Sequence, residues 1–410
     1  MKRKIFSAVA VVAVLMTFVT TVYAAVITYS NTETEHIARL PGRTLDGVRY
    51  TGVGGIAIGR KKNSMFVMKA EEKADSGSNN LTEQSALLYD FPDISNPTER
   101  HYYRLRHAGH ANAMAIDATN IYVCGWTTNI KSGNQQSNEY NNWILMIPRE
   151  MFATLRKGSD GAFIHKYNSD NPDEPGYSVL YPKVKTVSDD GTVKYSDYER
   201  IINTISLYKG NYQFIIGIGR LSKTEHNHDN FMSGLGDDMA FTTAKLEQVN
   251  GKTYFVVSES PEDIFVVKNN VANKDAVNQD ICYAQGHGLF IPKWYGGDGN
   301  AENKYFNTTK TVIMWANIDG SHGSKVINGV SYRYYEPNKI VIDKSKEKGS
   351  GGKLLFDKFE PESIAFTKDE NGYDGELLFS CNVKKGDSEQ TYGDSVYKLT
   401  HDGGKNFSLN

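Results

Sequence analysis

The sequence predicts an all-β protein, a β-propeller with five blades of about four antiparallel strands each. Three observations lead to this fold class. The 410 residues are 39% hydrophobic and include 37 glycines and 25 tyrosines, a composition typical of strands joined by turns. A hexapeptide pattern recurs five times, and further short apolar runs follow each copy. Radial repetition of small antiparallel sheets is typical of β-propellers, in which neighbouring sheets pack face to face.

The five hexapeptides share a small third residue, a larger aliphatic fourth residue and an apolar sixth residue. They are VGGIAI (53–58), ANAMAI (111–116), INTISL (202–207), GHGLFI (286–291) and PESIAF (361–366). We expect each hexapeptide to form the innermost strand of one blade, beside the central channel.

A turn and a second apolar run follow each hexapeptide, and a third and fourth run complete most units. The second runs are SMFVM, NIYVCGW, YQFIIGIG, TVIMWA and ELLFSCNV. The third runs are SALLYDFP, NWILMIP, TTAKLEQVNG and SVYKLTHDG, and candidate outer strands are RHYYRLR, AFIHKY, TYFVVSE and KIVIDK. Each unit therefore reads as an antiparallel meander.

The repeats are unevenly spaced, which predicts long insertions between strands. The clearest are 159–200, 222–239 and 295–310, whose polar composition is typical of surface loops. A count of six or seven blades stays open, because 253–267 could be a blade of its own. Ring closure needs an outer strand beside SVYKLTHDG, and AVITYSNTE (25–33) is the candidate, so 25–410 is predicted as one domain.

Residues 1–24 read as a signal peptide. Lys2, Arg3 and Lys4 precede an uncharged apolar stretch, 5–22, and the small residue Ala24 ends a cleavage motif. We expect cleavage after Ala24, a secreted protein and no stable membrane span afterwards; an uncleaved anchor is the alternative.

Charge and cysteine content exclude several classes of function. A net charge of −2 gives no basic field for nucleic acid. Cys124, Cys282 and Cys381 lie far apart, and Cys124 and Cys381 fall inside apolar runs, which favours buried thiols over disulfides. No CxxC, GxSxG or Walker motif is present.

The second residue of each hexapeptide should lie near the central channel, giving a mixed polar ring. Its members are Gly54, Asn112, Asn203, His287 and Glu362. Residues two positions earlier share the same side of a strand and add Gly52, His110, Ile201, Gln285 and Glu360. The ring reads either as the polar lining of a wet channel or as a ligand-binding funnel.

Three kinds of chemistry are open for this ring. His110, His287 and Glu362 could hold a divalent metal such as zinc or manganese. Glu362 and Glu360, with His287 and His110, could serve a polysaccharide hydrolase or lyase, since glycoside hydrolysis uses two carboxyl groups. For simple binding, Asn112, Asn203, Gln285, His287 and Glu362 would contact a glycan, and Trp294 and Tyr295 could stack on its sugars.

The stretch PESIAFTKDENGYDGELLFSCNV, followed by GDSVYKL, resembles the closing portion of helveticin J-like proteins, the large class III bacteriocins. His110-Ala-x-Ala is also similar to a stretch of that family, although Asn112 stands where we expect an acidic residue. The resemblance implies an exported protein that acts on other bacteria.

These observations favour a secreted β-propeller that binds a bacterial cell-surface glycan or wall component, with antibacterial activity as the resemblance implies. A polysaccharide hydrolase or lyase with its site in the central funnel is one alternative. A protein-interaction scaffold is the other.

Overall fold

The computed structural model shows an all-β ring, and the β-propeller fold class is confirmed. Helix is limited to two short segments in the described residues, α2 (Met151–Leu155) and α3 (Asn230–Leu235). The structure describes residues 28–59, 63–71, 85–109, 111–125, 143–168, 170, 176–210, 212–219, 230–271, 277–278, 280–294, 310–345, 347–348, 355–356, 358–368, 374–384, 393–401 and 405–406.

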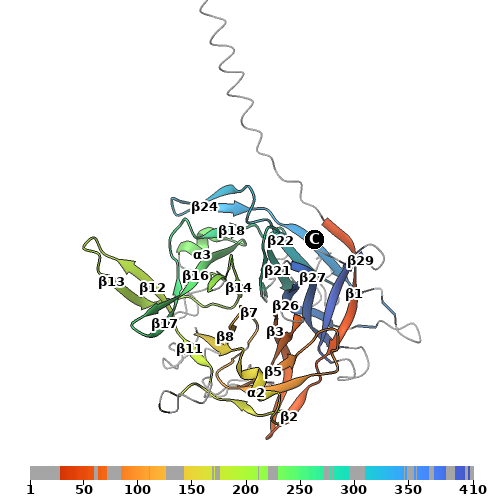
Figure 1. Ribbon diagram of the computed structural model, residues 1–410. Helices are drawn as coiled ribbons and strands as arrows, with labels where there is room; N and C mark the ends of the chain where they lie inside the picture. The colour runs from red at the N-terminus through yellow and green to blue at the C-terminus, as the bar shows by residue number, and fades with distance from the viewer. Residues whose placement is uncertain are drawn as a thin grey trace, which may run out of the picture.

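Five meanders, numbered here I to V, follow one another around the ring. Their innermost strands in the described chain are β3 (Val48–Ile58), β7 (Met114–Ile116), β14 (Ile205–Leu207), β20 (Cys282–Ala284) and β26 (Lys358–Lys368). Each contacts the next, and β26 contacts β3, so the inner strands close on themselves. Figure 1 shows β3, β7, β14 and β26 around the centre.

Most strands of meanders I and II are those that the apolar runs predict, whereas no run predicts 43–45 or 178–180, and AFIHKY supplies an edge strand of meander I. Meander I continues through β4 (Met65–Glu71), β5 (Ala86–Phe91) and β6 (His101–Leu105), with β2 (Arg43–Leu45) and β10 (Phe163–Ile164) at its edges. Meander II continues through β8 (Asn120–Gly125), β9 (Trp143–Pro148) and β11 (Ser178–Leu180).

Meander III continues through β15 (Gln213–Gly217), β16 (Met239–Val249) and β17 (Lys252–Val257). The hairpin of β12 (Pro182–Val187) and β13 (Val193–Asp197) extends this sheet beyond β17. On its other side, β16 also pairs with β18 (Phe265–Val267), which leads to β24 (Val330–Tyr335) and β23 (Gly323–Ile327). Residues 253–267 therefore belong to meander III and do not form a separate blade.

Meander IV continues through β21 (Gly288–Trp294), β22 (Lys310–Ala316) and β25 (Asn338–Asp343), with β19 (Val277–Asn278) beside β21. Meander V continues through β27 (Asp374–Lys384), β28 (Ser395–His401) and β1 (Thr28–Arg39), with β29 (Lys405–Asn406) beside β28.

The number of hydrogen-bonded sheets differs from the five blades predicted. The described strands form four sheets, because β1 pairs in parallel with β25 and so joins meanders IV and V into one ten-stranded sheet. A parallel contact between outer strands of neighbouring units leaves no mark in the hydrophobic pattern of either strand, since register there depends on backbone groups.

The hydrophobic core lies between meanders, because alternate residues of each strand face opposite neighbours. In β8, Ile121 and Val123 pack toward meander I, whereas Tyr122 and Cys124 pack toward meander III. Equivalent clusters fill the remaining spaces between consecutive meanders, including the one between V and I. Burial of both faces explains why the runs read as continuous apolar segments.

An N-terminal strand closes the ring as predicted, but it lies later in the chain than 25–33, because the start of that segment pairs with β25. Residues 32–39 of β1 pair antiparallel with β28, from Thr32 opposite His401 to Arg39 opposite Ser395. Beyond β1, the Leu40 amide donates to the Asp394 carbonyl oxygen at 2.7 Å. The ring is therefore closed by pairing the first described strand with the last meander.

Buried charges reinforce this closure. Lys69 of β4 lies 2.5 Å from the Asp394 carboxylate, with the two side chains 2% and 7% exposed. The same ammonium donates to the Leu40 carbonyl oxygen at 3.0 Å. Meander I, the end of β1 and the start of β28 thus meet at one buried ion pair.

The prediction that GHGLFI is an innermost strand is wrong. Its apolar residues lie in β21, the second strand of meander IV, and β20 is the innermost one. The true counterpart is Asp280-Ile281-Cys282-Tyr283, in which an aspartate takes the position of the small third residue. Because the third position is acidic in this repeat, the segment does not fit the hexapeptide pattern. The next strand, which contains GHGLFI, fits it by chance.

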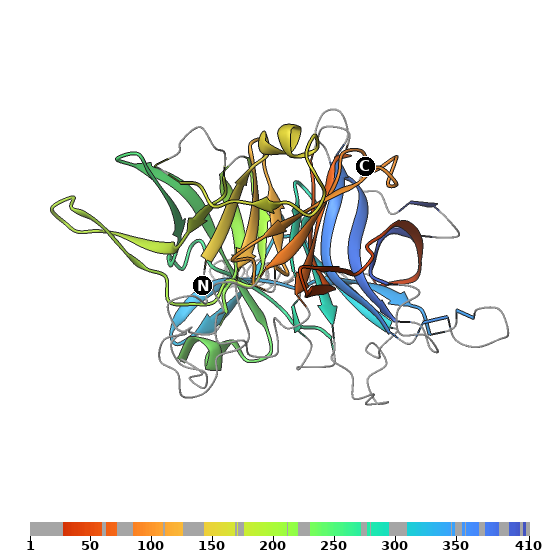
Figure 2. The same ribbon diagram turned by 90° about the horizontal axis from the view of Figure 1, so that it is seen from below.

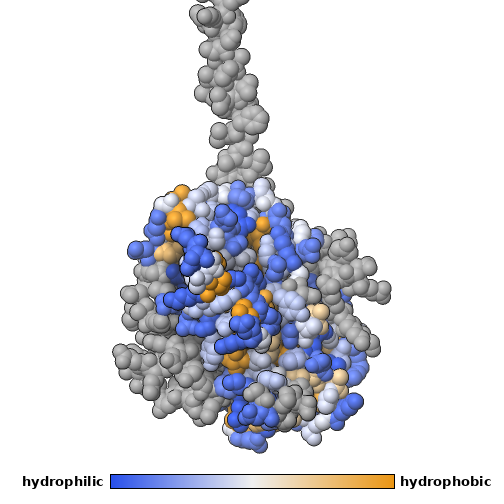
Figure 3. Space-filling view, turned by 60° about the vertical axis from the view of Figure 1, so that its left-hand side comes forward, coloured by the Kyte–Doolittle hydropathy of each residue, from blue (hydrophilic) through white to orange (hydrophobic). Residues whose placement is uncertain are grey.

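The β12–β13 hairpin projects from the body of the ring, as Figure 2 shows. It belongs to the predicted insertion 159–200. Most of the face in Figure 3 is hydrophilic, with apolar side chains in small separate patches.

Other predictions have mixed outcomes. Cys124, Cys282 and Cys381 are free, and Cys124 and Cys381 are buried as expected. The leader 1–24 lies outside the described residues, as do 222–229 of the insertion 222–239 and nearly all of the insertion 295–310. Within the described part of the chain, no helix is both long and apolar enough to cross a bilayer.

Candidate functional site

A buried carboxyl group lies where the inner strands converge. Asp280 accepts a hydrogen bond from the Ser363 hydroxyl of β26, and Ser363 in turn accepts one from the Ile56 amide of β3 at 2.9 Å. The amides of Met114 and Ile205 also act on the Asp280 carboxylate and favour its ionised form. Residues from meanders I to V therefore meet around one side chain.

Burial dominates the chemistry of this group. Asp280 and Ser363 have no solvent exposure. Desolvation raises the pKa of Asp280 well above its ordinary value, against the hydrogen bonds that lower it. We call this level of the channel, at Asp280 and Ser363, the axial plug.

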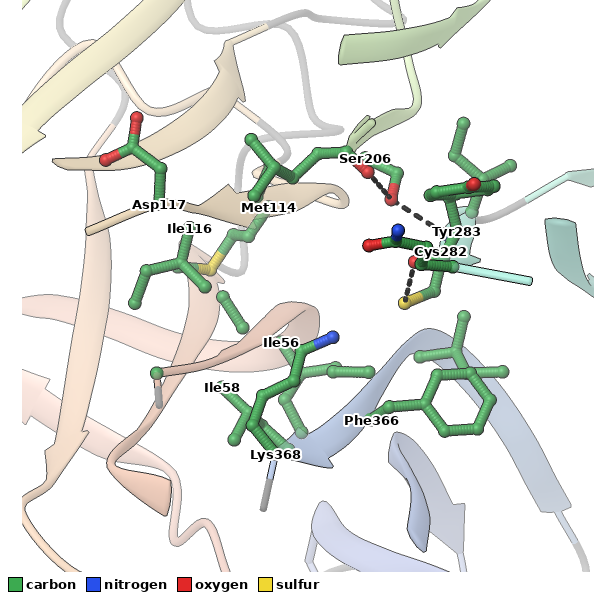
Figure 4. Close-up of a pocket in the computed structure, with 18 of the residues that line it drawn as sticks. Ile56, Ile58, Met114, Ile116, Asp117, Ser206, Cys282, Tyr283, Phe366 and Lys368 are labelled. Carbon is green, nitrogen blue, oxygen red and sulfur yellow. Dashed lines mark hydrogen bonds between the residues drawn. The ribbon is translucent and has the colours of Figure 1, made fainter. Parts of the chain in front are cut away.

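A cavity of about 330 Å³ lies beyond the axial plug, where the inner strands end. We call it the axial pocket. Its walls consist of the residues that follow the plug level in each inner strand. The apolar part of this lining includes Ile56, Ile58, Met114, Ile116, Ile281 and Phe366 (Figure 4).

Polar residues complete the lining between these walls. Ser206 of β14 accepts a hydrogen bond from the Tyr283 amide at 2.8 Å, which ties β14 to β20 beside the pocket. Asp117 follows β7, and its carboxylate accepts from the Thr119 and Asn120 amides at 2.7 Å and from the Tyr122 hydroxyl at 2.7 Å. Asp117 thus holds the turn between β7 and β8, and in Figure 4 its carboxylate points away from the cavity centre.

Three cationic side chains line the axial pocket: Arg149, Lys209 and Lys368. Arg149 donates to the Asp117 carbonyl oxygen at 2.8 Å, so its guanidinium is fixed beside the turn. Lys209 pairs with Asp319 at 3.3 Å and is half-exposed. Lys368 ends β26, and its side chain extends toward the middle of the cavity in Figure 4.

Cys282 contributes a thiol to the same lining. Burial raises its pKa to about 12, although the Lys368 ammonium opposes this shift. The thiol is therefore protonated at neutral pH and is a poor nucleophile.

The structure separates the members of the predicted polar ring. Asn112 and Asn203 are half-buried just before β7 and β14, ahead of the axial plug. Gln285 and His287 lie in the turn after β20, on the pocket side of the plug, and Gln285 lines the axial pocket. His287 accepts a hydrogen bond from the Trp315 indole through its carbonyl oxygen at 2.6 Å. The placement of His287 in one ring with Asn112 is therefore wrong, because its repeat was misaligned by one strand.

Glu360 and Glu362 do lie together, buried near the start of β26. Lys358 forms an ion pair with Glu360. Burial raises the pKa of Glu362 well above its ordinary value, and the charge of Glu360 and a hydrogen bond to it add to the shift. Burial and the neighbouring carboxylate therefore both favour the protonated form of Glu362. Neither residue lines the axial pocket.

The remaining predicted residues cannot be placed in the site. His110 and Tyr295 lie outside the described residues, and of Trp294 only the backbone is described, opposite Val277. Among the described residues, no group of three or more histidine, cysteine, aspartate or glutamate side chains is placed to hold a metal ion. His287 and Glu362 lie on opposite sides of the axial plug, so they do not form the predicted metal set.

The pattern analysis missed the cationic lining. Lys368 and Lys209 come two residues after the hexapeptides PESIAF and INTISL, and Asp117 comes directly after ANAMAI. A charged residue one or two positions after three of the hexapeptides was a usable signal. The predicted polar ring was built from residues at the starts of the inner strands, so it did not include the residues at their ends.

No protein-family model and no curated protein matches this chain. Solved structures give matches over most of its length. An α-L-arabinofuranosidase of Podospora anserina in complex with cellotriose has a TM-score of 0.42 and 10% identity, covering 91% of this chain and 98% of that one. The catalytic domain of a Coprinopsis cinerea GH62 α-L-arabinofuranosidase has a TM-score of 0.43 and 8% identity, with the same coverage. A Trypanosoma rangeli sialidase in complex with sialic acid has a TM-score of 0.35 and 7% identity, covering 92% and 60%.

Proposed function

We propose that this protein binds a carbohydrate in its axial pocket. One observation carries the proposal: the pocket combines apolar walls with a polar and charged lining at the point where the inner strands converge. Sugars present apolar C–H faces together with hydroxyl groups, so they need both kinds of contact. A concave site of a few hundred cubic ångströms with a few convergent polar groups is typical of small-ligand binding.

Binding fits this pocket better than hydrolysis does. Glycosidases use two carboxyl groups about 5–10 Å apart. Asp117 is the one acidic residue in the described lining, and its carboxylate is occupied by amides and a hydroxyl. The pocket therefore supplies groups for recognition without an acid–base pair.

A hydrolase remains the second candidate because of Glu362. Its raised pKa keeps a proton available at neutral pH, as a general acid requires. The hydrogen bond between Glu362 and Glu360 nevertheless brings the two groups closer than either glycosidase geometry allows. Release of reducing ends by the wild type and its loss in Glu362→Gln would support hydrolysis. Bound glycan without product would support binding alone.

The place of action follows from the N-terminal segment. The basic and apolar pattern of 1–24 supports secretion. The segment from β26 through β28 resembles helveticin J-like proteins, which supports a bacterial surface glycan as the target. Binding of the mature protein to isolated cell walls, with growth inhibition measured in parallel, tests this part of the proposal.

Filling the pocket tests its role directly. Ile116 is partly exposed to the cavity, so Ile116→Trp should occupy it and weaken glycan binding at least 10-fold in calorimetry. Val326 is 65% exposed in the hairpin of β23 and β24, and Val326→Trp is the matched control that should bind normally. If Ile116→Trp keeps the wild-type Tm and binds as well as the wild type, the axial pocket is not the site. If no glycan in a broad panel binds, the proposal fails.

A further inference from the structure

The described lining of the axial pocket carries more positive than negative side chains. Arg149, Lys209 and Lys368 face a single acid, Asp117, in the described lining. Asp117 is 5% exposed and turns its oxygens to the Thr119 and Asn120 amides. Its charge is therefore compensated on the protein side. The described lining as a whole carries more cationic than acidic side chains.

The positions of the cations define where an anion would bind. Lys368 extends into the cavity from β26. Arg149 is fixed by bonds to the carbonyl oxygens of Asp117 and Ala118 at 2.8 and 3.3 Å. Lys209 is partly compensated by Asp319 and also lines the pocket. A carboxylate in the pocket would be attracted by these cations, and the apolar walls would strengthen this attraction.

A second hollow adjoins the pocket. A groove of about 990 Å³ lies between the turns of meanders I and II and helix α2. It shares Ala118 and Arg149 with the axial pocket, so these two residues border both hollows. Pro92 and Pro148 give it apolar surface.

The groove is also held rigid by buried charge. Arg156 at the end of α2 donates two hydrogen bonds of 2.7 Å to Asp90, whose side chain is fully buried. This bidentate pair fixes α2 against meander I. The groove wall is therefore formed before any ligand arrives.

We propose that the ligand is an acidic oligosaccharide whose carboxylate-bearing terminal sugar occupies the axial pocket and whose following sugars lie in the adjoining groove. This inference rests on the proposed carbohydrate binding and names its ligand class. Arg149 contacts the chain where it passes from pocket to groove. The axial plug closes the far end of the pocket, so the chain enters by its end.

Matched ligands test the charge. The full mature chain is titrated with oligogalacturonates of one to six sugars, with other oligouronates and with the methyl ester of each, since esterification keeps the sugar and removes its charge. We expect the acidic hexamer to bind at least 10-fold more tightly than its ester, with affinity falling as salt rises. We also expect it to bind at least 10-fold more tightly than the acidic monomer. Equal affinity for acid and ester overturns the anion site, and equal affinity for monomer and hexamer overturns the groove.

Variants locate the effect. Lys368→Gln should reduce the preference for acid over ester at least 10-fold without changing Tm, whereas Lys194→Gln on the exposed β13 strand is the control and should keep it. An unchanged preference in a folded Lys368→Gln variant overturns the assignment. Binding of neutral and acidic glycans alike would overturn this inference and leave the proposed function standing. Failure to bind any glycan would remove both.

Discussion

Replacing Lys69 with Met should lower the free energy of unfolding by about 3–5 kcal/mol at pH 7, because removal of one partner leaves the other buried charge uncompensated. The Lys69 ammonium and the Asp394 carboxylate are 2.5 Å apart and almost inaccessible to solvent. The variant also leaves the Leu40 carbonyl oxygen without the donor that reaches it at 3.0 Å. All three groups belong to the closure of the ring, so the loss should appear in global unfolding.

The pH dependence of stability tests the same prediction through protonation of Asp394. Burial lowers the pKa of Lys69 and raises the pKa of Asp394 despite their mutual attraction, so desolvation outweighs the pairing. Without Lys69, Asp394 can take up a proton as the pH falls, and the loss of stability should shrink between pH 7 and pH 5. The double variant Lys69→Met/Asp394→Leu should recover at least half of the loss.

Urea unfolding of Lys69→Met, Asp394→Leu and the double variant at both pH values measures these effects. A loss below about 1 kcal/mol for Lys69→Met would refute the reasoning, since it would lie in the range of an exposed pair. Additive losses in the double variant would also refute it, because coupled partners must deviate from additivity.

Two further substitutions test packing and burial. Gly288 has φ +112°, and a Cβ there would lie 2.1 Å from the Ala316 carbonyl oxygen, so Gly288→Ala should cost at least about 3 kcal/mol in urea unfolding; a change below 1 kcal/mol would contradict the close approach. Burial lowers the pKa of Lys293 to about 7 from 10.5. The folded state therefore binds fewer protons, and wild-type stability should rise between pH 7 and pH 10.5. Lys293→Met should remove this rise and increase the free energy of unfolding by up to about 5 kcal/mol at pH 6. The measurement is Tm as a function of pH for the wild type and the variant. Parallel Tm curves for the two proteins would contradict the prediction.

The strands of the propeller could be predicted because burial leaves a direct mark in the sequence. Runs such as NIYVCGW and ELLFSCNV are apolar on both faces, and each became a strand covered on both sides. Closure by the N-terminal strand followed from the need to protect an edge. The joining of meanders IV and V through β1 and β25 could not be predicted, because a parallel pairing of outer strands through backbone groups leaves no mark in the hydrophobic pattern of either strand.

The site was harder to predict because one residue broke the repeat. Asp280 stands where the other repeats have a small third residue, so 280–283 does not match the hexapeptide pattern, whereas GHGLFI does. His287 was therefore assigned to the polar ring in error. The Glu360 and Glu362 pair was found correctly as neighbours two positions apart on one strand. Their burial depends on Lys358 and on the packing of meander V, which spacing alone does not reveal.

The misread residue also explains the shape of the channel. At the plug level the inner strands carry small residues, and at Gly55 an added Cβ would lie 2.5 Å from the Met114 side chain, so the strands approach closely there. Asp280 fills the centre of this narrow level, and Ser363 joins it to β26 and β3. No solvent reaches either side chain. A ligand therefore cannot thread the ring, and the axial pocket can receive only the end of a chain or a free sugar. Asp280, which does not fit the repeat pattern, thus closes the channel and restricts the proposed glycan contact to the end of a chain or a free sugar.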